Sequence, residues 1–228
     1  MKKVVALLPI KQNSERVKGK NFRELCGKPL YQWILETLLS CNNIKKVVID
    51  TDSEEFIAEL AQKYPQVQTI LRPENIRGGM VSMNEVIAHD MTVCADEDYF
   101  IQTHTTNPLL SKESIDRAIQ MYFKNLEKND SLFSVNRIQA RTYWKDGRPI
   151  NHILGELKRT QDLEAVYEEN SNLFIFSKAS FQKTRSRLGQ QPYLFETNRQ
   201  ESLEIDEEED FEFVKLVLSA LMADRAGD

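Results

Sequence analysis

Residues 4–21 read VVALLPIKQNSERVKGKN and decide the fold class. The stretch begins almost continuously apolar, as expected of a strand buried on both faces of a parallel sheet. It then becomes polar and carries four cations, Lys11, Arg16, Lys18 and Lys20. Open α/β sheets bind their ligands at the carboxyl ends of the strands, which is where this loop begins. The stretch therefore predicts an α/β fold with a ligand site in its first loop.

Short apolar runs alternate with amphipathic segments along the rest of the chain. Strands are expected at residues 4–9, 46–49, 67–71, 99–102, 132–137 and 173–176. Capping boxes predict helices starting at Asp52, Ser82 and Asp206, because each has glutamate three residues later. The last of these helices is expected to close the chain over residues 206–223. This alternation predicts a doubly wound, mostly parallel, Rossmann-like sheet.

The chain of 228 residues suggests a single domain, 1–228. Residues 138–170 lack a clean apolar period and contain Asp146-Gly147, a pair typical of a type I′ hairpin turn. A segment of this kind cannot form a core of its own. We therefore interpret residues 138–170 as an extension that packs against a partner subunit, which predicts a homodimer.

The composition excludes several classes of protein. With 30 Lys and Arg against 35 Asp and Glu, the chain lacks the positive charge that non-specific nucleic-acid binding requires. A run of about 18 apolar residues does not occur, so no membrane span is predicted. Three cysteines without C-x-x-C spacing indicate a reducing compartment, and we expect a cytoplasmic protein.

The first loop suits a polyphosphate, because clustered cations and exposed backbone N–H groups both attract phosphate oxygens. It matches neither the G-x-x-x-x-G-K-[ST] motif of P-loop hydrolases nor the G-x-G-x-x-G motif of dinucleotide-binding enzymes. From charge alone, a solvated basic loop is the competing interpretation.

Residues 9–21 and Gly27-Lys-Pro-Leu30 resemble the opening signature of the acylneuraminate cytidylyltransferases, the CMP-sialic acid synthetase family. The likeness runs in order from residue 4 to about residue 214. Its further segments are Asp50-Thr-Asp52, Leu71-Arg-Pro73, Gln102 with Thr106-Asn-Pro-Leu109, Asn170 and Ser202-Leu-Glu-Ile-Asp206. The resemblance implies a nucleotide-diphospho-sugar transferase-like fold with a small dimerisation extension.

The resemblance also implies a reaction, in which a hydroxyl of an acidic sugar attacks the α-phosphorus of CTP and releases pyrophosphate. It assigns catalytic roles to Lys11, Arg16 and Lys20, and nucleotide binding to Ser14, Asn21, Arg72 and Ser82. It assigns acceptor binding to Gln102, Lys145, Arg159 and Asn170, with the extension completing the site of the partner. Mg²⁺ is expected on Glu204 and Asp206, two residues apart and facing the same way on an extended segment.

Three differences from the family pattern leave alternatives open. Lys11 replaces the usual arginine, Glu204 replaces the usual aspartate, and residues 102–110 are lengthened near the expected acceptor site. The acceptor can therefore be sialic acid, a related nonulosonate, or another acid such as a phosphonate. A nucleotide-binding regulator without catalysis is a further alternative. His104 is either a general base or a polar loop residue, and Asp206 either a metal ligand or a helix cap.

Overall fold

The computed structural model describes residues 2–226. Its strands are β1 (Val4–Leu7), β2 (Glu24–Leu25), β3 (Lys28–Pro29), β4 (Ile44–Thr51), β5 (Gln68–Leu71), β6 (Tyr99–Thr103), β7 (Ser131–Ile138), β8 (Val166–Ser177) and β9 (Pro192–Glu196). Its helices are α1 (Leu30–Ser40), α2 (Glu54–Lys63), α3 (Met83–Val93), α4 (Lys112–Asn125), α5 (Lys178–Thr184) and α6 (Glu208–Ala226). Short 3₁₀ turns occur at Lys20–Phe22, Glu74–Ile76 and Thr160–Asp162.

Seven strands form one sheet in the order β5-β4-β1-β6-β8-β7-β9. Among the described residues of this sheet, β8 alone runs antiparallel to its neighbours, and the remaining pairs are parallel. β2 and β3 form a separate antiparallel pair. The chain moves outward from β1 to β4 and β5, then returns to the other side of β1 as β6. The carboxyl ends of β1 and β6 therefore form the topological switch point, where sheets of this kind bind ligands.

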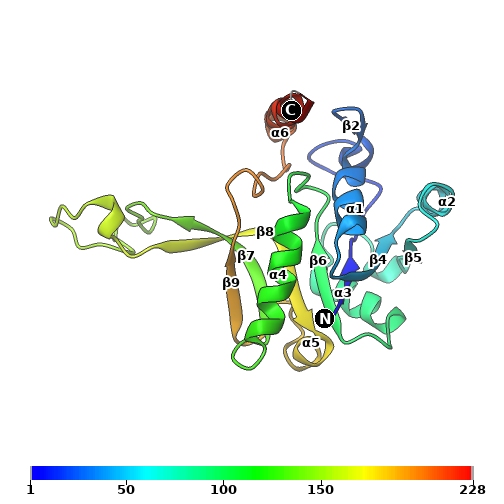
Figure 1. Ribbon diagram of the computed structural model, residues 1–228, viewed down its shortest axis with the longest axis horizontal. Coiled ribbons are helices and arrows are strands. Elements are labelled where there is room, and N and C mark those ends of the chain that lie inside the picture. The colour runs from blue at the N-terminus through cyan, green and yellow to red at the C-terminus, as the bar shows by residue number, and fades with distance from the viewer. Residues whose placement is uncertain (1, 227–228) are drawn as a thin grey trace.

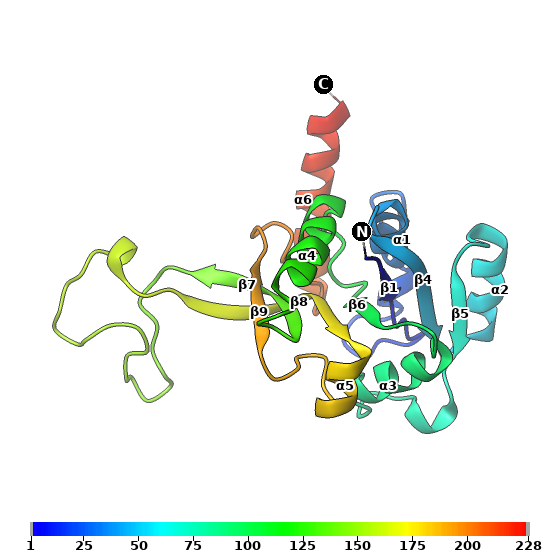
Figure 2. The ribbon, with the colours of Figure 1, turned by 60° about the horizontal axis from the view of Figure 1, so that its bottom comes forward.

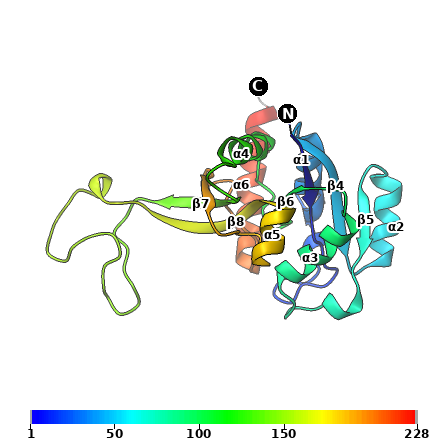
Figure 3. The ribbon, with the colours of Figure 1, turned by 90° about the horizontal axis from the view of Figure 1, so that it is seen from below.

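Helices cover both faces of the sheet, as the apolar first strand requires (Figure 1). Val4, Ala6 and Leu8 contribute to the core under α1, α2 and α4. Val5 and Leu7 face the opposite way, toward α3 and α5, which lie together below the sheet in Figure 3. Alternate side chains of one strand thus enter two separate cores. The predicted doubly wound, mostly parallel sheet is confirmed.

The strands in the second half of the sheet are longer and more numerous than the apolar runs indicate. β8 begins at Val166 instead of residue 173, because its polar first half pairs with β7 rather than entering a core. The edge strand β9 was not predicted. It begins with Pro192, which lacks the N–H of a ladder residue and is tolerated only at such an edge or strand start.

Of the helix starts predicted at Ser82 and Asp52, the first is confirmed and the second is wrong. Ser82 and Glu85 form the predicted capping box at the start of α3. The prediction at Asp52 is wrong, because Ser53 caps α2 and accepts a hydrogen bond from the Phe56 N–H. The Asp52 carboxylate instead accepts from the backbone N–H of Gln12 at 2.7 Å and so ties the first loop to the end of β4.

α6 packs through Phe211, Val214 and Leu218 against Leu25 of β2 and against Leu30, the first residue of α1. It stands upright beside the sheet and carries the C-terminus away from it (Figure 2). Neither α6 nor any other helix within residues 2–226 combines the length and the apolarity needed to cross a membrane.

Between β7 and β8 the chain forms a long arm, residues 139–165, which projects from the sheet (Figures 1 and 2). The predicted hairpin turn is present, since the Trp144 N–H donates to the Arg148 carbonyl at 2.8 Å. Its predicted type is wrong: Gly147 has a positive φ, 84°, whereas Asp146 does not. The Gly147 N–H donates to the Trp144 carbonyl, giving a three-residue loop with its glycine in the left-handed region.

Large apolar side chains are exposed along this arm. Leu157 is 94% exposed, Leu154 65%, Ile153 59% and Trp144 57%. Isolated surface apolar residues are normal, but a row of them on a projecting segment marks an interaction site. The arm therefore has the composition of a surface that another chain covers.

Candidate active site

The first loop folds back over the switch point between β1 and β6. The Asn21 side-chain amide donates to the Lys11 carbonyl at 2.8 Å, which closes the loop on itself. The same side chain accepts from the Thr105 hydroxyl at 2.6 Å, so the loop is fixed to the segment that follows β6. The side chains of Lys11 and Ser14 make no hydrogen bond within residues 2–226, which leaves their polar atoms available to a ligand.

Lys20 is the buried cation of the loop, with 8% of its surface exposed. Its Nζ donates to the Ile205 carbonyl at 2.5 Å and lies 3.5 Å from the Asp206 carboxylate. Burial lowers the pKa of Lys20, and the charge of Asp206 opposes that shift. An ammonium has three N–H donors, so these contacts leave it capacity for a further acceptor. Because Lys20 is buried and contacts Ile205 and Asp206, its charge is fixed at the centre of the site.

The Asp206 carboxylate contacts cations of the first loop and does not cap the last helix. Its carboxylate accepts from Arg16 Nη2 at 2.8 Å. The predicted capping box at Asp206 is wrong, because α6 begins at Glu208 and Asp210 supplies the capping carboxylate. The Asp210 side chain accepts from the backbone N–H groups of Asp206 at 2.9 Å and Glu207 at 2.7 Å. The Asp206 carboxylate is thereby free to face the loop.

Glu204 lies beside Asp206 and accepts from the Thr106 hydroxyl at 3.1 Å. Burial and then the charge of Asp206 raise the pKa of Glu204, as expected of two neighbouring carboxylates. Carboxylate oxygens are the donors that Mg²⁺ prefers, and a magnesium site on a phosphate commonly uses only one or two of them. The two residues therefore fit Mg²⁺.

Arg72 and Ser82, both predicted to bind nucleotide, lie at two other points of the same edge. Arg72 is buried, and its Nε donates to the Asp50 carboxylate. Its carbonyl accepts from Arg77 Nε at 2.7 Å. The Ser82 oxygen accepts from the Glu85 N–H at 3.3 Å, which leaves its hydroxyl proton and one lone pair for a ligand.

A second buried carboxyl, Asp90, faces Asp50 from α3. Both oxygens of Asp90 and the Oδ2 of Asp50 have no other hydrogen-bond partner within the described residues. Burial and then the charge of Asp50 raise the pKa of Asp90 to about 9. A carboxyl whose pKa is raised this far is protonated at neutral pH, so Asp90 adds no second negative charge beside Asp50.

On the other side of the switch point, Gln102, His104 and Arg187 form a polar cluster. Arg187 Nη1 donates to the Gln102 side-chain oxygen and lies 3.4 Å from His104 Nε2. The Gln102 amide nitrogen lies 3.1 Å from the same His104 atom. Since both neighbours are donors, His104 Nε2 is an acceptor and its ring is neutral with the proton on Nδ1. Burial and then the charge of Arg187 lower the pKa of His104 to about 3.

This arrangement contradicts a general-base role for His104, because its one free lone pair already accepts from the protein. Arg187 was missed in the sequence, where it is one of several cations in the polar segment 183–191. The only local signal was its position just before β9. Arg187 is covered by Phe174 of β8, whose ring centroid lies 3.5 Å from the guanidinium carbon.

The remaining predicted acceptor residues make no hydrogen bond to this cluster within residues 2–226. The Asn170 side-chain amide donates to Asn136 at 2.9 Å and to Thr197 at 2.7 Å, so it joins β8 to its neighbours. Arg159 pairs with Asp162 at 2.7 Å, and Lys145 is exposed at the arm's turn. Both cations lie on the arm, which projects away from the Lys20 cluster of its own chain (Figure 1).

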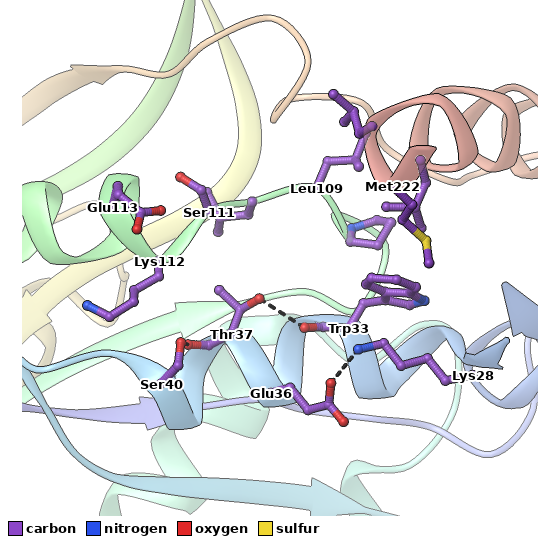
Figure 4. A pocket seen from close by; sticks show the side chains of 14 residues that line it. Lys28, Trp33, Glu36, Thr37, Ser40, Leu109, Ser111, Lys112, Glu113 and Met222 are labelled. Atoms are coloured by element: carbon purple, nitrogen blue, oxygen red, sulfur yellow. Dashed lines mark hydrogen bonds and ion pairs between the residues drawn. The ribbon is translucent and has the colours of Figure 1, made fainter. Parts of the chain in front are cut away.

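A pocket of about 350 Å³ lies elsewhere, between α1, α6 and the start of α4 (Figure 4). Trp33 and Met222 form its apolar end, and Lys28 lies over the Trp33 ring at 3.9 Å. Within the described chain, its lining includes none of the residues predicted to bind nucleotide, acceptor or metal. Trp33 packs against the core formed with α6, with part of its surface at this pocket.

Relatives of known identity share nearly the whole length of the chain. N-acylneuraminate cytidylyltransferase of Escherichia coli O18:K1:H7 (strain RS218 / NMEC) is 28% identical over 217 residues, which are 92% of this chain and 51% of that protein. Pseudaminic acid cytidylyltransferase of Campylobacter jejuni subsp. jejuni serotype O:2 is 24% identical over 226 residues, 94% of this chain and 96% of that protein. The chain thus spans about half the length of the first relative and nearly all of the second.

Solved structures agree on the fold. A CMP:2-keto-3-deoxy-manno-octonic acid synthetase complexed with CTP superposes with a TM-score of 0.68 at 13% identity, covering 96% of this chain and 99% of that chain. The 4-diphosphocytidyl-2C-methyl-D-erythritol synthase of Anaerococcus prevotii superposes with a TM-score of 0.67 at 14% identity, covering 95% and 96%. The cytidylyltransferase family model matches residues 5–226, which include the first loop, the switch point and the carboxylates before α6. The chain belongs to the cytidylyltransferase family.

Proposed function

We propose that the protein transfers the cytidylyl group of CTP to a hydroxyl of an acidic sugar. The hydroxyl oxygen forms a bond to the α-phosphorus, its proton is lost, and the bond to the β-phosphate oxygen breaks to release pyrophosphate. The observation that carries the proposal is the contact of Lys20 with Ile205 and Asp206. It places a buried cation and two carboxylates at the switch point of a sheet shared with this family.

Different cations of the site are proposed to bind different phosphates of the triphosphate. Lys20 is fixed and partly desolvated, so it suits the phosphate at which charge develops during transfer. Lys11 and Arg16 lie on the exposed part of the loop and suit the outer phosphates. Ser14 and Asn21 add polar groups beside them, while Arg72 and Ser82 are proposed to contact the nucleoside.

Glu204 and Asp206 are proposed to hold Mg²⁺. When bound, the ion would neutralise charge on the triphosphate and help to orient it. Asp206 now pairs with Arg16, an exposed contact whose energetic contribution is small. The carboxylate can therefore exchange this partner for another at little cost.

A homodimer is the proposed assembly, with the arm of one subunit covering part of the other. The exposed apolar side chains of residues 139–165 support it, because they need a surface to bury them. Lys145 and Arg159 would then meet the partner's acceptor rather than their own. A single domain with this arm, acting in the cytoplasm, is the proposed organisation.

The acceptor is proposed to be a sialic acid or a related nonulosonate, a class to which the names of the relatives point. A different acid, such as a phosphonate, is a second candidate because the segment after β6 is lengthened and carries His104 against Arg187. A regulator that binds CTP without catalysis is the third.

Pyrophosphate release separates these functions. The purified protein would be incubated with Mg²⁺ and CTP, ATP, GTP or UTP, each with N-acetylneuraminate, pseudaminate, 2-keto-3-deoxy-octonate or a phosphonate. We expect release with CTP and at least one sugar acid, and a product whose mass contains CMP. Equal turnover of ATP and CTP would overturn the cytidylyl assignment. CTP binding without release on any acceptor would favour the regulator.

A further inference from the structure

We propose that Arg187 binds the carboxylate of the acceptor and does so within its own subunit. This inference rests on the proposed function and names a specificity residue for it. The family resemblance assigns acceptor binding to two other cations, Lys145 and Arg159, and both lie on the arm. Arg187 lies instead on the loop between α5 and β9, against Gln102 at the carboxyl end of β6.

Arg187 is a cation with no carboxylate at ion-pair distance in the part of the chain that the structure describes, although the charge of Glu169 acts on it. Within residues 2–226 its side chain makes no ion pair, whereas the buried Arg72 pairs with Asp50 and Lys20 with Asp206. Burial lowers the pKa of Arg187 to about 10, and the charge of Glu169 opposes that shift, so the guanidinium remains charged at neutral pH. A partly buried charge without a directly paired carboxylate is costly, and an anionic ligand would reduce that cost. The paired carboxylate is therefore expected to arrive with the substrate.

The guanidinium is held in one position. One edge donates to the Gln102 side-chain oxygen, and one face lies on the Phe174 ring. Gln102 is itself fixed, because its amide nitrogen donates to the Thr103 carbonyl at 2.8 Å. Neutral His104 adds no competing charge. A guanidinium held in this way keeps its remaining N–H donors, whose geometry matches the two oxygens of a carboxylate.

The loop that carries Arg187 is also fixed. The backbone N–H of Arg187 donates to the Asn84 side chain on α3 at 3.2 Å. Farther along, the Asp130 carboxylate accepts from the backbone N–H groups of Gln190 at 2.9 Å and Gln191 at 2.9 Å. Between them, Gly189 has a φ of 64° and lies so close to Asp130 that a Cβ would meet its oxygen at 2.3 Å. Little ordering is therefore needed when a ligand binds.

The position of the cluster is right for an acceptor. Gln102 pairs with Leu7, the last residue of β1, at the switch point itself. Both Arg187 and Lys20 contribute charge that lowers the pKa of His104, so His104 lies near both cations. The triphosphate has the loop cations, while Arg187 is the cation of the polar cluster on the other side. A single fork-shaped cation suits one carboxylate, placed next to the phosphate that is transferred.

Arg187→Gln removes the charge at nearly the same size, and Arg187→Lys keeps the charge without the fork. Arg185→Gln is the matched control, because Arg185 is exposed on the same segment and makes no ion pair within the described chain. Thermal unfolding of all three variants would first establish that each is folded. If Arg187→Gln does not fold, Arg187→Lys carries the test.

Binding is measured by calorimetry, with N-acetylneuraminate, pseudaminate and 2-keto-3-deoxy-octonate and their methyl esters, in the presence of a non-hydrolysable CTP analogue. The wild type should prefer a free acid over its ester. Arg187→Gln should bind that acid about 10- to 100-fold more weakly, the range expected for a lost hydrogen bond to a charged group. It should also lose the preference for the acid, while Arg187→Lys falls between and Arg185→Gln matches the wild type.

Turnover gives an independent measure. Arg187→Gln should raise the KM for the acid and leave the KM for CTP unchanged. If wild type and Arg187→Gln discriminate equally between acid and ester, or if the wild type binds none of the acids, the assignment of Arg187 is overturned. A wild type that binds an acid through Arg187 but releases no pyrophosphate would overturn the proposed reaction and leave the Arg187 assignment standing.

Discussion

The Lys20 ammonium lies 3.5 Å from the Asp206 carboxylate, and its hydrogen bond to the Ile205 carbonyl fixes that separation. The contact joins the first loop of the sheet to the segment just before the last helix. Neither side chain caps a helix, since Asp210 supplies the cap of α6. Each charge can therefore be removed by substitution without removing a helix cap.

Lys20→Ala should lower kcat/KM for CTP by about a hundredfold or more, because a preorganised charge at the transferring phosphate contributes ~3 kcal/mol to the transition state. Initial rates of pyrophosphate release would measure the loss. Lys18→Ala is the matched control. Lys18 is exposed on the same loop, and its removal should leave kcat/KM within about twofold, the scale of an ordinary surface substitution. Equal losses in both variants would mean that the loop acts only through its net charge.

Asp206→Asn should lower activity at least about a hundredfold, the scale of charge stabilisation that a catalytic metal supplies. Part of the loss should return at raised Mg²⁺ or Mn²⁺ concentration. Glu204→Gln should act in the same direction but less strongly, since its carboxylate already accepts a hydrogen bond from Thr106. Steady-state rates over a magnesium titration would check both.

The melting temperature supplies the control for Asp206. Asp206→Asn should leave it nearly unchanged, whereas Asp210→Ala should cost about 1 kcal/mol of stability, because two backbone N–H groups before α6 lose their acceptor. An Asp206→Asn enzyme with normal kcat at limiting magnesium would remove Asp206 from the metal site.

Asp90→Asn should become relatively more stable as the pH rises from 5 to 8. The pKa of Asp90 is raised to about 9 in the folded protein, well above its unfolded value, so its neutral form stabilises the fold at low pH. Between those two pKa values the folded state binds the extra proton, and stability falls by up to about 1.4 kcal/mol per pH unit. Denaturant unfolding of wild type and variant across this range tests the sign; parallel pH profiles would contradict it.

Light scattering at micromolar concentration should give the mass of a dimer. Leu157→Asp should shift the protein toward monomer, because it places a charge among the exposed apolar residues of the arm. Lys63→Asp, at an exposed position on α2 away from the arm, is the control for added charge. A wild type of monomeric mass would remove the dimer.

Mixed dimers test whether Arg159 reaches the neighbouring site. An Arg159→Ala chain combined with a Lys20→Ala chain should recover activity beyond either variant alone, because one of the two sites then has both residues. Lack of recovery in dimers of verified composition would show that Arg159 does not act across the interface. Arg187 is expected to act in its own chain. An Arg187→Gln chain combined with a Lys20→Ala chain should therefore recover no activity, because each of the two sites still lacks one of these residues.

Local sequence chemistry predicted those parts of the molecule whose causes are local. The apolar run before Lys11 gave the central strand, and the Ser82 capping box gave the start of α3. At Asp52 two adjacent residues can each cap a helix, and only the loop from Gln12, distant in sequence, decides which one does. Propensity could not choose between them.

The unpredicted part of the site depends on contacts between distant segments. Arg187 is marked by its burial on Phe174 and its bond to Gln102, and neither is visible in the sequence around it. The family resemblance identified the nucleotide side, where the loop carries its own signature. It did not identify this cation, because the segment between α5 and β9 has no such signature.

The bond between Lys20 and Ile205 also sets the order in which the site can appear during synthesis. The two residues are 185 positions apart, which a ribosome adding about 5–20 residues per second covers in roughly 10 to 40 s. Throughout that interval the first loop has emerged without its carboxylates, and its four cations have no partner from the end of the chain. A nascent chain released before residue 206 would carry the phosphate-binding loop but no complete active centre.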